Sequence, residues 1–202
     1  MIATAPPISQ TLTIQWPPEI RAIVTLEEFA ALVEANPELQ FERTATGGLI
    51  VTPPTGSETG KRNFRLNIQF GKWFEAHPEL GEGFDSSTGF CLPNGANRSP
   101  DLAWVARSRW ESLTPEEREG FAPLCPDFVM ELRSPLDQLD VLQAKLTEYI
   151  DNGARLGWLI DPQNQQVWVY RPGQEVDCLD QPVELSGEDV LPGFILPLAR
   201  IW

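Results

Sequence analysis

Two acidic residues set inside strand-like apolar runs are the first candidates for chemistry in this sequence. Asp101 lies in the run Ser99–Val105, and Glu131 lies in the run Pro126–Pro135. An ionised carboxylate in an apolar strand is costly unless a positive group meets it. Carboxylate oxygens are also ligands that Mg²⁺ prefers. We therefore predict that Asp101 and Glu131 bind one divalent cation, Mg²⁺ or Mn²⁺.

Two basic residues follow these acids in the chain. Arg133 comes two positions after Glu131, so both side chains point to the same face of a strand. Lys145 lies on the border of the apolar stripe of a helix predicted over residues 139–152, where its stem can pack while its ammonium reaches back to the strand end. Carboxylates that hold a metal, with a lysine beside them to orient water or stabilise charge, suit phosphodiester hydrolysis.

Each of these residues also has a purely structural explanation. Asp101 suits a turn or a cap at a strand end. Glu131 suits a buried ion pair with Arg133 or Lys145. Only the convergence of these side chains in space favours a catalytic site, so the hypothesis depends on the elements that carry them.

A long helix predicted over residues 57–76, with Ser57 as its cap, carries a basic stripe. The stripe consists of Lys61, Arg65 and Lys72, opposite the apolar side of the helix. It is typical of a solvated helix face, and a ridge that contacts phosphates is the functional alternative. Glu58 could be a further acid of the site, but an i,i+4 pair with Arg62 explains it equally well.

The elements that must position these residues alternate in type along the chain. Capping and periodicity predict helices over residues 25–35, 57–76, 107–121 and 139–152. Strands are expected over residues 39–43, 49–52, 83–87, 89–92, 156–160 and 167–170 and in the runs around Asp101 and Glu131. Gly47 and Gly48 mark a hairpin turn, and Gly153 suits the residue after a helix end. This order predicts a mixed α/β sheet covered by helices on at least one face.

Composition limits the class of protein. The 202 residues suit a single domain over residues 19–202 behind a loose tail over residues 1–18. The net charge of -14 argues against nonspecific nucleic-acid binding by bulk electrostatics, although a substrate channel could still be locally basic. Three widely spaced cysteines indicate free thiols in the cytosol, and a single histidine disfavours a zinc site, a serine triad and a Cys/His nucleophile. No signal peptide or membrane-spanning run is present, so we expect a cytoplasmic protein without a membrane partner.

Four motifs follow one another from Ser99 to Pro162. They are Ser-Pro-Asp-Leu-Ala, Pro-Asp-Phe-Val-Met-Glu-Leu-Arg-Ser-Pro, Lys-Leu-Thr-Glu-Tyr-Ile-Asp-Asn-Gly and Gly-Trp-Leu-Ile-Asp-Pro. In this order they resemble the Uma-type family of restriction-endonuclease-like proteins, and the resemblance extends from about residue 26 to residue 202. It implies the PD-(D/E)XK architecture, an α/β restriction-endonuclease-like fold with a mixed central sheet flanked by helices.

The resemblance also implies roles for the candidate residues in a metal-dependent DNA endonuclease. Asp101 becomes the first metal acid and Glu131 the second. The family pattern has a lysine two positions after the second acid, whereas this chain has Arg133, which stays protonated and cannot act as a base. Lys145 resembles the migrated lysine of such folds. The implied catalytic set is therefore Asp101, Glu131, Arg133 and Lys145, with Lys145 positioning water and Arg133 stabilising the phosphate.

Two other functions remain open at the level of sequence. A non-catalytic interaction or regulatory protein that retains the nuclease fold is favoured by the net charge of -14 and by Arg133. Hydrolysis of another phosphate ester at the same residues is the other alternative. Nucleases of this fold often act as dimers, and the seven tryptophans would permit a homodimer.

Overall fold

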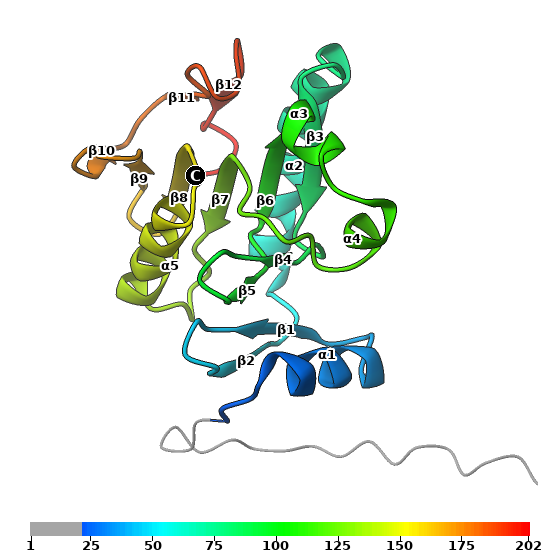
Figure 1. Ribbon diagram of the computed structural model, residues 1–202. Coiled ribbons are helices and arrows are strands. Elements are labelled where there is room, and N and C mark those ends of the chain that lie inside the picture. Colours follow the sequence, from blue (N-terminus) through cyan, green and yellow to red (C-terminus); the bar gives the residue numbers. More distant parts are fainter. Residues whose placement is uncertain (1–21) are drawn as a thin grey trace, which may run out of the picture.

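A six-stranded mixed sheet forms the centre of the protein (Figure 1). The computed structural model describes residues 22–202, so the tail expected over residues 1–18 lies outside the described residues. The sheet has the order β10-β9-β8-β7-β6-β3. These strands are β3 (Gly81–Asp85), β6 (Leu102–Ala106), β7 (Phe128–Leu132), β8 (Leu156–Asp161), β9 (Gln166–Tyr170) and β10 (Asp177–Asp180). Only the β7–β8 pair of this sheet is parallel, which confirms the predicted mixed sheet.

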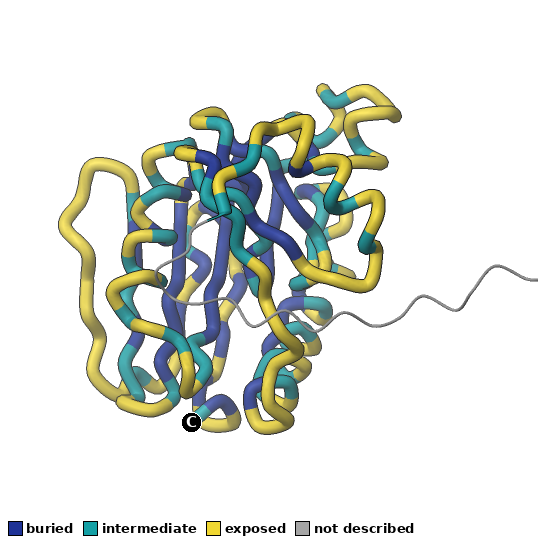
Figure 2. The backbone as a smooth tube through the Cα atoms, turned by 90° about the horizontal axis from the view of Figure 1, so that it is seen from below, coloured by how far each residue is buried: buried dark blue, intermediate teal, exposed yellow. Residues whose placement is uncertain are grey.

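Helices cover both faces of this sheet. Helix α2 (Ser57–Ala76) buries Leu66, Phe70 and Trp73 in one apolar cluster, together with alternate residues of β7. Helix α5 (Leu139–Asp151) buries Leu146 and Tyr149 in a second cluster on the other face. Figure 2 shows the buried strands between outer layers that are largely exposed. Because side chains alternate along a strand, β7 presents Glu131 toward α5 and its apolar neighbours toward α2.

A second, four-stranded sheet of order β2-β1-β5-β4 lies next to the central one. It consists of β1 (Gln40–Arg43), β2 (Leu49–Thr52), β4 (Phe90–Cys91) and β5 (Asn97–Arg98), with helix α1 (Leu26–Ala35) packed against β1. The predicted hairpin is confirmed, and Gly47 at its turn has a φ of 90°, a conformation that favours glycine. This sheet brings residues from the first hundred positions against α5.

Several predicted boundaries were wrong. The helix expected over residues 107–121 is two short helices, α3 (Arg107–Glu111) and α4 (Pro115–Glu119), because Thr114 begins a new helix through a capping box with Glu117. The cap of α2 is Gly56 rather than Ser57, and no side chain caps this end.

The remaining elements complete the core on the α2 face. Strands β11 (Glu184–Ser186) and β12 (Ile195–Pro197) form an antiparallel pair whose Leu185 and Leu196 join the same cluster as α2. The three cysteines are free thiols, as expected. No helix in residues 22–202 is both long enough and apolar enough to span a bilayer.

Candidate metal and catalytic site

Asp101 lies immediately before β6 and connects three elements. Its Oδ2 accepts a hydrogen bond from the backbone N–H of Leu132 on β7 at 2.8 Å. Its Oδ1 accepts a hydrogen bond from Nδ2 of Asn63 on α2 at 2.9 Å. The carboxylate of Asp101 therefore sits against β7 beside Glu131, and it is the less buried of the two acids.

Glu131 lies near the end of β7, and only 4% of it is exposed. Its Oε1 is 2.8 Å from Nζ of Lys145, on the second turn of the helix that follows. The hydroxyl of Tyr149, one turn further along α5, donates to the same oxygen at 3.4 Å. The structure thus brings together Asp101, Glu131 and Lys145, whose convergence the sequence could only suggest.

A third acid, Glu42 on β1, belongs to the same cluster. Its Oε1 is 2.7 Å from Nζ of Lys145 and accepts the backbone N–H of Ser99 at 2.9 Å. Its Oε2 is 3.2 Å from Nη1 of Arg98. Lys145 therefore bridges Glu42 and Glu131, and it also donates to the carbonyl of Ser99 at 3.2 Å.

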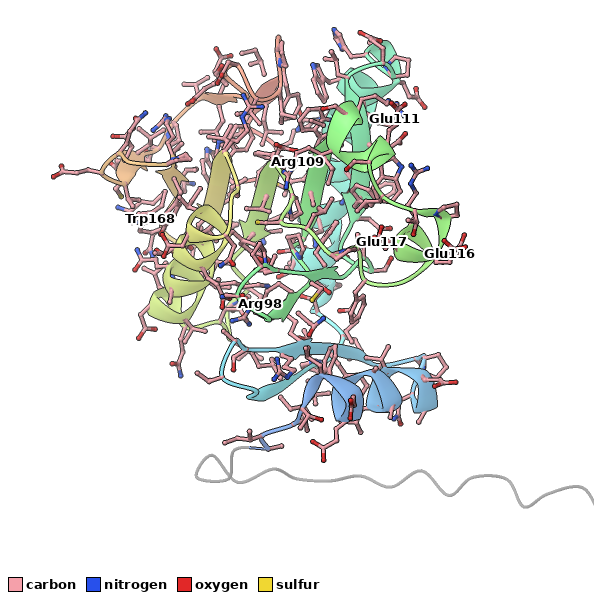
Figure 3. All side chains as sticks on the ribbon, in the orientation of Figure 1. Arg98, Arg109, Glu111, Glu116, Glu117 and Trp168 are labelled. Atoms are coloured by element: carbon pink, nitrogen blue, oxygen red, sulfur yellow. The ribbon has the colours of Figure 1, made fainter. Side chains whose placement is uncertain are left out.

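Arg98 extends this cluster to the surface of α5. Its Nε is 2.6 Å from Oε2 of Glu148. Figure 3 shows Arg98 on β5, close to α5. A chain of alternating charges thus runs from Glu148 through Arg98, Glu42 and Lys145 to Glu131, and it fixes the smaller sheet against the central one.

The cluster contains four carboxyl groups and two cations: Asp101, Glu131, Glu42 and Glu148 against Lys145 and Arg98. Burial raises the pKa of Glu131 to about 8, and repulsion from Asp101 and Glu42 adds to it, although Lys145 acts in the opposite direction. Burial also raises the pKa of Asp101, in spite of the hydrogen bonds from Leu132 and Asn63. A bound cation would lower both values.

The pKa values of Glu42 and Lys145 are set by their charged partners rather than by burial. Burial alone would raise the pKa of Glu42, but Lys145 and Arg98 together outweigh it and leave this pKa below its usual range. Burial alone would lower the pKa of Lys145, yet Glu131 and Glu42 outweigh burial and raise it. Lys145 is therefore an ammonium at neutral pH and cannot act as a general base.

The donor set around Asp101 fits a hard divalent cation. Oδ1 of Asn63 is buried without a hydrogen-bond partner among the described residues, next to the Asp101 carboxylate that its Nδ2 binds. Two carboxylates and an amide oxygen suit Mg²⁺, which retains several waters. Residues 22–202 contain no group of three or more His, Cys, Asp and Glu side chains arranged to hold a metal. Waters would therefore have to complete the ligand set.

Comparison with known proteins places the chain in a family. The profile of the Uma2 family, described as "putative restriction endonuclease", matches residues 26–199. The chain belongs to the Uma2 family. A crystal structure of a "putative nuclease belonging to DUF820" from Anabaena variabilis matches it with a TM-score of 0.68 and 24% identity, over 83% of this chain and 90% of that chain. This likeness shows a shared fold. No curated protein matches the sequence.

Arg133 of this Uma2 chain lies outside the cluster of acids. Its Nη1 is 2.7 Å from Oδ2 of Asp161, which is fully buried at the end of β8, and its Nε donates to the carbonyl of Asp137 at 3.2 Å. In the described part of the chain it makes no hydrogen bond or ion pair with Asp101 or Glu131. The role of Arg133 at the phosphate stays a prediction, and its observed contacts are structural.

The basic stripe of α2 is largely engaged in this Uma2 chain. Nζ of Lys61 lies 2.5 Å from Oε2 of Glu58. Glu58 therefore pairs with Lys61, and the i,i+4 pair with Arg62 that the sequence suggested was wrong. Arg62 instead donates to the carbonyl of Ile201, and Arg65 donates to the carbonyl of Arg200. These contacts fasten the C-terminal segment to α2 and leave little of the stripe for phosphates.

Sequence reasoning missed Glu42, Arg98 and Asn63 in this Uma2 chain. Glu42 lies in the short strand Gln-Phe-Glu-Arg, where polar residues flank a single apolar one, so a charged residue there is no local anomaly. Arg98 and Asn63 have no local signal, because their partners lie 50 and 38 positions away. Only tertiary structure brings them to the site.

Proposed function

We propose that this Uma2 chain is a Mg²⁺-dependent endonuclease that hydrolyses phosphodiester bonds in DNA. The observation that supports this most is the meeting of Asp101 and Glu131 from adjacent strands, with the Asp101 carboxylate bonded to the backbone N–H next to Glu131. The family description supplies the class of substrate. The cluster has four carboxyl groups against two cations among the described residues, and this surplus of acids supports a divalent cation as the missing partner.

Each side chain of the cluster has a part in this proposal. Asp101 and Glu131 would hold the ion, with Oδ1 of Asn63 as a further oxygen. A bound Mg²⁺ supplies neutralisation of charge on the phosphoryl oxygens and lowers the pKa of water. Lys145 keeps its proton, orients Glu131 and stabilises developing negative charge. Glu42 keeps the ammonium of Lys145 in place.

One observation favours the second candidate, a non-catalytic protein that retains the nuclease fold. Nζ of Lys145 has contacts with two carboxylates and one carbonyl, at 2.7, 2.8 and 3.2 Å, so its three donors are all engaged. A lysine held in this way can serve as a purely structural bridge. Metal binding and strand cleavage separate the two candidates.

We expect Mg²⁺ to stabilise the protein against unfolding. An ion that binds only the folded chain stabilises it by mass action, by about 1.4 kcal/mol at ten times its Kd, or about 3–6 °C in Tm for a domain of this size. Asp101→Asn and Glu131→Gln should each abolish the shift. The measurement is thermal unfolding in EDTA and in a Mg²⁺ or Mn²⁺ series.

Glu111→Gln is the matched control for these variants. Glu111 is exposed at the end of α3, away from the cluster (Figure 3), so its loss should leave the metal-dependent shift intact. A Tm that is indifferent to both metals in the wild-type chain would contradict a metal site here.

We also expect the wild-type chain to nick supercoiled plasmid in Mg²⁺ and not in EDTA. Asp101→Asn and Glu131→Gln should each slow nicking by at least about 100-fold, since loss of even the outer partners of a metal site costs 10–100-fold. Gel separation of supercoiled and relaxed plasmid over time measures the rate. Equal rates for Glu131→Gln and Glu111→Gln would assign the activity to a contaminant and favour the non-catalytic candidate.

A further inference from the structure

A pocket of about 400 Å³ lies between α2 and β3, the edge strand of the central sheet. Phe70 and Phe74 line it, and their rings are nearly parallel, with centroids 6.2 Å apart. Gly71 and Gly83 line the rest of this end. A Cβ on Gly71 would meet nothing within 4 Å, whereas a Cβ on Gly83 would collide with the ring of Phe70. Only 5% of Phe70 is exposed, whereas Phe74 is half-buried, so the ring of Phe74 and the room above the helix backbone at Gly71 are open to a ligand.

Polar groups line the other end of the pocket. Asn67, Asp85 and Thr88 contribute there. Oδ1 of Asp85 accepts hydrogen bonds from the N–H and the hydroxyl of Ser87, at 3.0 and 2.6 Å. Oδ2 of Asp85 has no partner in residues 22–202 and can accept a hydrogen bond from a ligand. Aromatic walls with a few fixed polar groups are typical of sites for planar, polar molecules.

This polar end adjoins the candidate metal site. Asp85 is the register partner of Leu102, the residue that follows Asp101. Asn67 lies one turn after Asn63 on α2, about 5.4 Å along the helix, and its Nδ2 donates to the carbonyl of Asn63. Asn63 in turn donates to the Asp101 carboxylate. The polar end of the pocket is therefore connected to the Asp101 carboxylate through Asn67 and Asn63.

The charge of the molecule makes such a pocket necessary for a nucleic-acid substrate. The net charge is -14, and the basic residues on α2 with described partners bind Glu58 or the C-terminal carbonyls. With this net charge, contacts to a continuous duplex backbone would gain little from overall electrostatic attraction. Stacking of a base on aromatic rings supplies affinity that does not depend on cations.

We propose that the pocket binds an unstacked nucleobase next to the scissile phosphate, so the substrate is DNA with a locally single-stranded segment. This inference rests on the proposed nuclease function and narrows its substrate class. The half-buried ring of Phe74 contacts the face of the base, and Oδ2 of Asp85 accepts a hydrogen bond from an exocyclic amine. Adenine, cytosine and guanine carry such an amine, whereas thymine does not.

Binding is measured with the full-length wild-type chain in EDTA, so that no strand is cut. The probe is a 12-nucleotide single-stranded DNA with a central 2-aminopurine, whose fluorescence reports stacking. Gly71→Leu fills the pocket at a helical position where leucine is well accommodated, and it should weaken binding by about 10-fold, within the range that one stacked base contributes. Ala76→Leu adds the same side chain at an exposed site at the end of α2 and should bind within about 2-fold of wild type.

A second comparison tests the polar end. Wild-type chain should bind an oligonucleotide of cytosines several-fold more tightly than one of thymines, and Asp85→Ala should remove that preference, within the 1–3 kcal/mol range of a base contact. Thermal unfolding of each variant shows that it is folded. Equal binding of the probe by wild type and Gly71→Leu, or tighter binding of blunt duplex than of single strand, overturns the pocket proposal.

The two proposals fail in different ways. If wild type nicks plasmid in Mg²⁺ but Gly71→Leu binds the probe as tightly as wild type, the nuclease proposal stands and the pocket proposal is refuted. If Gly71→Leu weakens probe binding but wild type nicks no plasmid in Mg²⁺ or Mn²⁺, the pocket proposal stands and hydrolysis is refuted. Absence of both probe binding and nicking refutes both.

Discussion

Replacing Lys145 by methionine is expected to lower the free energy of unfolding by about 3–5 kcal/mol at neutral pH, the range found when one partner of a buried ion pair is removed. Nζ of Lys145 lies 2.8 Å from Glu131 and 2.7 Å from Glu42, and both acids are buried. Methionine retains most of the apolar stem and removes the charge, so the buried Glu42 carboxylate, which Lys145 helps to keep ionised, loses its closest cation. Urea unfolding of the wild-type and variant chains in EDTA measures the difference.

Lys61→Met is the matched control for this variant. Lys61 also has a close carboxylate partner, Glu58, but both side chains are largely exposed, so water screens the pair and its loss should change stability far less. The loss caused by Lys145→Met should also shrink as the pH is lowered, because protonation of Glu42 removes the charge that Lys145 neutralises. A loss below about 1 kcal/mol would show that water or side-chain movement solvates these acids, and the cluster would then not be a closed, dry site.

Local patterns in the sequence predicted most of the fold because they are set by neighbours in the chain. The hairpin turn at Gly47, the capping box at Thr25 and the C-terminal Gly153 of α5 all act over a few residues. The sheet order was not predictable in this way. Pairing of β7 with both β6 and β8, and the separate sheet that carries β1, depend on contacts between distant segments.

The residues of the candidate site also fall into those with a local signal in the sequence and those that only long-range contacts bring to the site. Asp101 and Glu131 were identified because a charged residue in an apolar strand is a local anomaly. Glu42 was missed, since its significance comes from Lys145, which lies more than a hundred positions further along the chain. Arg133 was placed at the site by strand alternation, but β7 ends at Leu132 and the side chain turns to Asp161 on the neighbouring strand end. Alternation predicts side-chain direction only within a strand.

The surplus of negative charge at this site leads to a second large effect, on the pH dependence of stability. The pKa of Glu131 is raised from 4.5 to about 8 in the folded chain. Between these values the folded chain keeps a proton on Glu131 that the unfolded chain releases. Stability from this group is therefore complete below about pH 4.5 and is lost as the pH rises through 8.

The expected size of this loss is roughly 5 kcal/mol as an upper bound, since one pKa unit corresponds to 1.36 kcal/mol. Asp101, whose pKa is also raised, acts in the same direction. The lowered pKa of Glu42 acts below pH 4.5, and the raised pKa of Lys145 acts above 10.5, so neither contributes between pH 5 and 9. Urea unfolding in EDTA across this range should therefore show a steeper decline for wild type than for Glu131→Gln.

Mg²⁺ should change this pH dependence in a way that a purely structural cluster would not. A carboxylate binds a metal only after it loses its proton, so the stabilisation by Mg²⁺ should grow between pH 6 and 9 and offset the decline seen in EDTA. Glu131→Gln should show neither the decline from this group nor its reversal by Mg²⁺, whereas Glu111→Gln should show both. If the free energy of unfolding of wild type and Glu131→Gln varied with pH in the same way, with and without Mg²⁺, Lys145 would already neutralise Glu131. Glu131 would then not bind a metal cation.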